Sequence, residues 1–159
     1  MTPADPVRAV VIGIGNDYRR DDGIGPAVAA QLAAHRLPGV RVLTCPAEPA
    51  AILDAWDGAD LAILVDAAAG DLPGRIRQCD WEDLDEPAPV SSHDLGLRQT
   101  YELGRVLQRV PAVLTIVTVG VADTGHGVGL SPAVAAALPG AVSTVRGLLG
   151  VQPQEPAHQ

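Results

Sequence analysis

The stretch that decides the fold covers residues 10–25 and reads VVIGIGNDYRRDDGIG. Its apolar first half is typical of a buried strand, and glycine ends that strand at Gly13 and Gly15. Asp21 and Asp22 follow within one short loop. Because ligands in α/β folds collect at the carboxyl ends of strands, this stretch predicts a functional site at the end of the first strand.

The same stretch departs from the fingerprint of a dinucleotide-binding loop. After Gly13-Ile14-Gly15 the third glycine should stand at residue 18, which is Tyr. The loop then offers two carboxylates where a pyrophosphate needs backbone N–H groups and a helix dipole. A metal site or a proton-transfer site is therefore favoured over a phosphate site.

Composition indicates one globular domain, which we expect over residues 1–150, followed by a flexible tail at 151–159. Of the 159 residues, 47% are hydrophobic and 19% are charged, which is typical of a folded chain. The net charge of −8 argues against a nucleic-acid surface. No apolar run reaches the roughly 20 residues that span a bilayer, and the N-terminus has no secretory pattern. The two cysteines have no CxxC spacing and are expected to stay reduced, which favours the cytoplasm. We expect a monomer.

Apolar runs alternate with helical patterns along the chain, which predicts a three-layer αβα sandwich with about five strands. Strands are expected at residues 8–15, 40–44, 61–65, 74–79 and 112–119. Helices are expected at residues 24–35 and 48–56, from 92 or 93 to about 109, and from 131 onward with an interruption at Pro139-Gly140. Residues 81–90 are expected to form a loop.

Three ionisable residues fall where strand ends meet at the ligand edge of such a sheet: Asp22, Asp66 and His93. Two carboxylates and an imidazole suit a divalent ion with open coordination positions, and they also suit acid/base chemistry without a metal. Each of these residues can instead have a purely structural role. Asp21 or Asp22 can cap the next helix, Asp66 can close an Asx turn, and His93 can be a solvated residue at a helix start.

Four blocks of sequence, in this order and spacing, resemble the NiFe-hydrogenase maturation proteases. They read GIGNDYRRDDGIG, LVDAAAG, SSHDLGL and GLSPAV, and the resemblance covers roughly residues 10–138. The resemblance implies a twisted, mixed but mostly parallel sheet between helices, which agrees with the pattern above.

The resemblance also implies a function. Members of the family are endopeptidases that remove a C-terminal extension from the hydrogenase large-subunit precursor after nickel insertion. Carried over block by block, their metal-binding residues fall on Asp22, Asp66 and His93, with Asp21 as support or cap. The nickel is expected to come with the substrate, and another divalent ion could substitute in isolation. No nucleic-acid or membrane partner is expected.

One segment departs from the family pattern. Many relatives carry an acidic residue followed by glycine after the second strand, whereas residues 44–49 here read TCPAEP. Glu48 keeps an acid nearby and is the candidate to act as support. The departure leaves open a nickel-site checkpoint or chaperone that does not cut. A peptidyl-tRNA hydrolase-like enzyme shares the strand and the Gly-x-Gly-Asn turn, but it expects a histidine in the loop after Tyr18, where none stands.

Overall fold

The computed structural model describes residues 8–80 and 92–150, and in these ranges five strands form one mixed sheet. The strands are β1 (Ala9–Ile14), β2 (Val40–Cys45), β3 (Leu61–Ala68), β4 (Ile76–Asp80) and β5 (Val113–Gly120). Their order across the sheet is β2-β1-β3-β5-β4, in which only β4 runs antiparallel to its neighbour. The predicted mixed, mostly parallel α/β sheet is confirmed.

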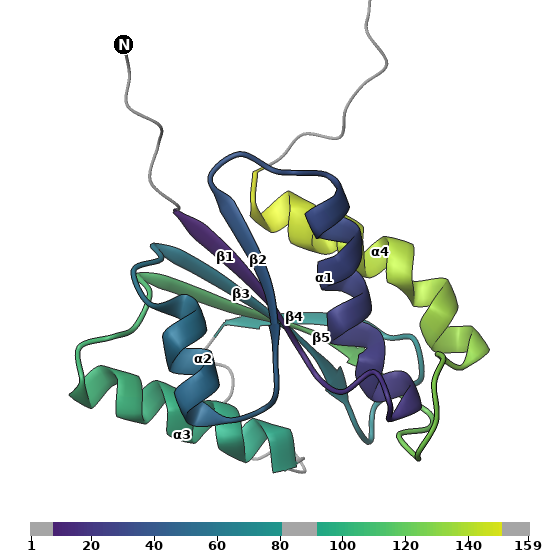
Figure 1. The fold of residues 1–159 in the computed structure, drawn as a ribbon. Coiled ribbons are helices and arrows are strands. Elements are labelled where there is room, and N and C mark those ends of the chain that lie inside the picture. The colour runs from purple at the N-terminus through teal and green to yellow at the C-terminus, as the bar shows by residue number, and fades with distance from the viewer. Residues whose placement is uncertain (1–7, 81–91, 151–159) are drawn as a thin grey trace, which may run out of the picture.

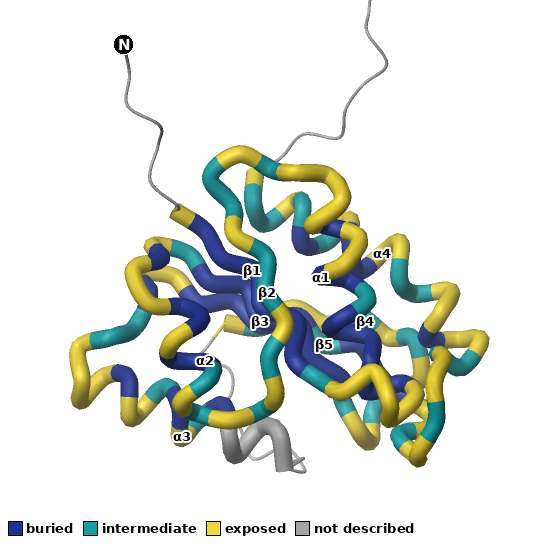
Figure 2. Tube along the Cα trace, in the orientation of Figure 1, coloured by how far each residue is buried: buried dark blue, intermediate teal, exposed yellow. Residues whose placement is uncertain are grey.

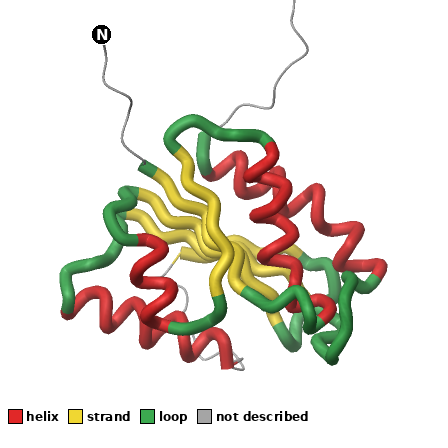
Figure 3. Tube along the Cα trace, in the orientation of Figure 1, coloured by secondary structure: helices red, strands yellow, loops and turns green. Residues whose placement is uncertain are grey.

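Helices cover both faces of this sheet (Figures 1 and 3). On one face lie α1 (Ile24–Ala34) and α4 (Pro132–Leu148), and on the other lie α2 (Pro49–Trp56) and α3 (Ser92–Val106). A short 3₁₀ turn, η1 (Arg20–Gly23), leads directly into α1. In the described ranges, none of these helices is long and apolar enough to cross a membrane.

The central strands are mostly apolar because both of their faces are covered. On β1, Val11 packs in the layer of α1 and α4, whereas its neighbour Ile12 packs in the layer of α2 and α3. Both side chains are fully buried, and every residue of β1 is buried (Figure 2). The two cores therefore meet at a buried sheet, whose carboxyl edge carries the loops described below.

Two sequence-based boundaries were wrong. The third strand was expected to stop at Val65, but β3 continues to Ala68, so Asp66 lies inside the strand. An interruption was expected at Pro139-Gly140, but α4 runs through it. Proline removes one helical N–H, yet its φ suits a helix. Val134 before it and Val142 after it are buried in the same layer, and this burial favours one continuous helix. The loop expected at 81–90 and the tail at 151–159 lie outside the described residues.

Candidate functional site

Three glycines let the start of α1 pack directly on the end of β1. A Cβ on Gly13 would lie 2.3 Å from the carbonyl oxygen of Gly25, and one on Gly25 would lie 2.5 Å from that of Ile14. Gly15 has φ +148° and would place a Cβ 1.9 Å from the carbonyl oxygen of Asp22. No side chain fits at these positions, so glycine is required for η1 to lie against the strand end.

The carboxylate of Asp22 accepts a single hydrogen bond from the described residues. The backbone N–H of Asn16 donates to its Oδ2 at 3.0 Å, and the residue is 7% exposed. Its other carboxylate oxygen, Oδ1, has no hydrogen-bond donor among the described residues. The only fully buried side-chain polar atom without a partner in those residues is Nε of Arg146, so Oδ1 of Asp22 is in reach of solvent. Asp22 therefore keeps one oxygen available for a ligand.

Asp21, the preceding residue, is fully buried and uses its carboxylate inside the protein. It accepts hydrogen bonds from the N–H groups of Ala122 and Asp123 at 3.0 and 2.9 Å. The N–H and hydroxyl of Ser131 donate to it at 2.6 and 2.8 Å. Burial raises the pKa of Asp21, but these hydrogen bonds outweigh it and leave the pKa below its ordinary value. Asp21 is thus a charged anchor at the start of α4.

Sequence reasoning missed the residues that bind Asp21. Ser131 was expected to be an N-cap, and it does occupy the N-cap position of α4, but it makes no side-chain cap hydrogen bond. Its hydroxyl instead donates to Asp21, 110 residues away in sequence. No local pattern could reveal a partner at that distance along the chain.

Backbone hydrogen bonds join the loop of Asp21 to the loop between β5 and α4. Arg20 N donates to Gly127 O at 2.9 Å, Gly127 N donates to Tyr18 O at 2.9 Å, and Asp21 N donates to Asp123 O at 2.9 Å. We call residues 18–21 together with residues 121–131 the loop pair. Since backbone groups on both sides are satisfied, the loop pair forms a fixed wall beside Asp22.

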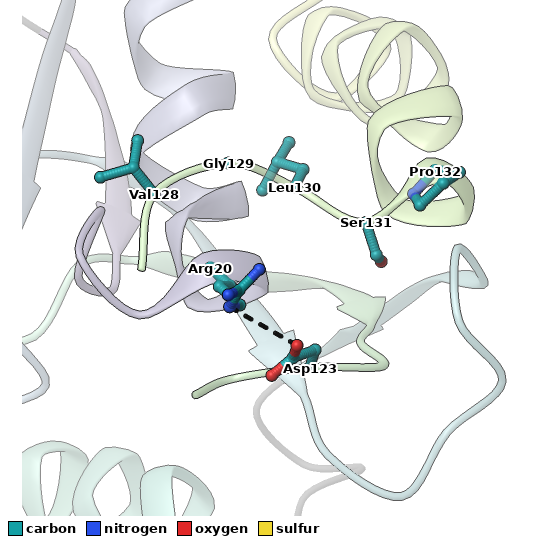
Figure 4. Close-up of a pocket in the computed structure, with 7 residues that line it drawn as sticks. All are labelled: Arg20, Asp123, Val128, Gly129, Leu130, Ser131 and Pro132. Atoms are coloured by element: carbon teal, nitrogen blue, oxygen red, sulfur yellow. Dashed lines mark ion pairs between the residues drawn. The ribbon is translucent and has the colours of Figure 1, made fainter. Parts of the chain in front are cut away.

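A pocket of about 310 Å³ opens on the loop pair (Figure 4). It is lined by Arg20, Asp123 and residues 128–132. Nε of Arg20 lies 3.6 Å from Oδ2 of Asp123 and donates to the carbonyl oxygen of His126 at 3.2 Å. The guanidinium is therefore fixed at the edge of the pocket.

The opposite side of the edge carries Asp66, Cys45 and Glu48. Asp66 is 2% exposed, and its Oδ1 accepts the N–H of Ala67 at 2.8 Å. Cys45 ends β2 as a half-buried free thiol. Burial, followed by the negative charges of Asp66 and Glu48, raises the pKa of Cys45 to about 11. Glu48 itself is exposed and precedes α2 with an extended backbone.

His93 is the second residue of α3, so its backbone belongs to the first turn of that helix. The expected helix start at 92 or 93 is confirmed. The side chain of His93 lies outside the described residues, so its position relative to Asp22 and Asp66 stays a prediction. Among the side chains that the structure does describe, no group of three His, Cys, Asp or Glu could hold a metal ion. The donor types of Asp22, Asp66 and His93 nevertheless suit a borderline divalent ion such as Ni²⁺.

These features define an α/β protein with an acidic site at the carboxyl edge of its sheet. The family model of HycI, described as hydrogenase maturation protease, matches residues 26–147. The chain therefore belongs to the hydrogenase maturation protease family, and it is an endopeptidase of that class. No curated protein matches it in a sequence search.

Solved structures agree with this assignment. The hydrogenase maturating endopeptidase HybD from Escherichia coli is 26% identical with a TM-score of 0.79, over 90% of this chain and 92% of that one. The hydrogenase 2 maturation peptidase from a Thaumarchaeota archaeon is 27% identical with a TM-score of 0.69, over 91% and 99%. The NiFe-hydrogenase maturation protease HycI from Thermococcus kodakarensis is 26% identical with a TM-score of 0.70, over 91% and 93%.

Proposed function

We propose that this endopeptidase removes the C-terminal extension of a NiFe-hydrogenase large-subunit precursor after nickel insertion. The observation that carries the proposal is the available Oδ1 of Asp22, at the same edge of the sheet as the buried carboxylate of Asp66. The first turn of α3, which carries His93, belongs to the helix layer that packs against the same sheet. Family membership supports the reaction class.

In this proposal the nickel of the precursor is the element that the enzyme recognises. Asp22, Asp66 and His93 would occupy three coordination positions, and the remaining positions would stay with ligands of the precursor. The charged carboxylates would favour a precursor that has received its metal over one that has not. We expect the enzyme to act as a monomer in the cytoplasm.

The test is processing of nickel-loaded large-subunit precursor, followed by mass spectrometry of the large subunit. Wild type should release the extension, and His93→Ala should leave it in place. His35→Ala is the matched control because His35 is an exposed histidine just after α1. Equal processing by wild type and His93→Ala would contradict nickel recognition through His93.

The same assay separates cutting from binding alone. A precursor that binds wild type and keeps its extension would favour the checkpoint or chaperone that the TCPAEP segment leaves open. The peptidyl-tRNA hydrolase-like alternative gains no support from the family assignment.

A further inference from the structure

The loop pair exposes two large apolar side chains beside the candidate site. Tyr18 is 73% exposed and Val128 is 75% exposed. Their backbones are adjacent, since Gly127 N donates to Tyr18 O at 2.9 Å and Arg19 forms a parallel bridge with Gly127. A single exposed apolar side chain is ordinary, whereas exposed apolar side chains on adjacent backbone segments can form a contiguous binding surface.

The pocket described above adjoins this apolar surface. Val128, Leu130 and Pro132 supply apolar atoms to its lining, while Arg20 supplies a guanidinium (Figure 4). His126 and Asp123 both contact Nε of Arg20, so its terminal nitrogens have no hydrogen-bond partner among the described residues. The pocket can therefore take an apolar group together with a hydrogen-bond acceptor.

One guanidinium of this surface has no described carboxylate partner. Arg19 and Arg20 are adjacent and exposed in a chain of net charge −8. Arg19 donates from Nε to Thr124 O at 3.3 Å and makes no ion pair with a described carboxylate. Arg20 is already paired with Asp123, so an incoming carboxylate would find its unneutralised partner in Arg19.

The surface is continuous with the candidate site through η1. This single turn carries Arg20 at the pocket and Asp22 at the strand end, with the buried Asp21 between them. A peptide bound at Arg20 would therefore lie one short turn of the chain away from Asp22.

We propose that Tyr18, Val128 and the Arg20 pocket form the docking surface for the large-subunit precursor. The occupant is a segment of that precursor in which a carboxylate stands next to an apolar side chain. The proposal rests on the proposed function for the identity of the partner. Docking here would raise affinity and leave the chemical step to the residues at the strand ends.

The test measures binding and cleavage separately, with nickel-loaded precursor as the probe. Val128→Asp should weaken binding about tenfold and raise KM by a similar factor, with kcat unchanged. Val106→Asp is the matched control, since Val106 is 80% exposed at the end of α3 and the charge change is the same. The control should bind within about twofold of wild type.

A second variant tests the charge component. Raising the salt concentration should weaken wild-type binding, and Arg19→Gln should reduce this salt dependence. Val128→Asp that binds as tightly as wild type, or a loss of the same size in Val106→Asp, would overturn the docking proposal. Wild type that fails to bind the precursor would also overturn it. Precursor that binds wild type but keeps its extension would contradict the proposed function and leave the docking surface standing.

Discussion

The two sides of the site differ in what their polar groups do. On the loop pair, four donors from Ala122, Asp123 and Ser131 saturate the carboxylate of Asp21. On the side of the strand ends, Asp22 receives one hydrogen bond and keeps an oxygen in reach of solvent. We call these the anchored side and the open side.

Two neighbouring residues of the same type thus have opposite environments. A carboxylate that is saturated by protein donors fixes structure, because replacing those bonds costs free energy. A carboxylate with an available oxygen can bind a ligand. The difference arises from the chain around each group and not from the side chain itself.

The largest effect is expected from the open side. Asp22→Asn should lower precursor processing by about 100-fold or more, because an amide is a poorer metal ligand than a carboxylate. The free energy of unfolding should change little. Time-resolved mass spectrometry of the large subunit measures the first quantity, and chemical denaturation measures the second. Asp60→Asn, at an exposed position before β3, is the control. Normal processing by Asp22→Asn would remove Asp22 from the site.

On the anchored side, substitution should lower the free energy of unfolding, which the substitution of Asp22 leaves nearly unchanged. Asp21→Asn should lower the free energy of unfolding by about 3 kcal/mol, because an amide NH₂ would face N–H and O–H donors in a buried site. Urea denaturation of Asp21→Asn and Asp22→Asn, measured side by side, tests the comparison. Equal losses in the two variants would mean that the hydrogen bonds of Asp21 do not anchor the fold.

The close packing of α1 on the end of β1 supports both sides of the site, and substitutions at two helical glycines test how much stability it contributes. Gly25→Ala should cost about 2 kcal/mol, because its Cβ would lie 2.5 Å from the carbonyl oxygens of Ile14 and Val65. Gly147→Ala meets nothing within 4 Å, and it should stabilise α4 by about 0.5 kcal/mol. Thermal unfolding of both variants measures the difference. If Gly25→Ala is as stable as wild type, the close approach of α1 to β1 is not required.

The smallest effect concerns the electrostatics of the open side. Cys45 has a pKa of about 11, so in a Cys79→Ser background its alkylation by iodoacetamide should be slow at pH 8 and rise toward that pKa. Glu48→Gln removes one of the charges that oppose the thiolate, so the midpoint should move to lower pH. Because the folded pKa is raised above the ordinary 9.0, this group destabilises the fold only above about pH 9. An unchanged midpoint in Glu48→Gln would place Glu48 away from the thiol.

Much of the fold could be predicted because buried strands carry their own signal. The apolar runs around Val11, Ile63 and Ile116 are covered on both faces, so their sequence is apolar without alternation. The ends of strands and helices were harder to predict than their existence. Asp66 looked like the end of a strand because it is charged, but the pairing with β5 continues past it to Ala68. Pro139 looked like a helix break, but burial on both sides of it carries α4 through.

The sequence by itself determined the order of strands and helices, the glycines at the end of β1 and the blocks that carry Asp22, Asp66 and His93. These are local properties of residue type and spacing. Only the tertiary structure gave Asp21 and Asp22 their different partners, since the donors to Asp21 come from 101 to 110 residues away. Burial and hydrogen bonding depend on which segments meet in space. That is why two adjacent aspartates, alike in residue type, become a saturated anchor and a carboxylate with an available oxygen in the fold.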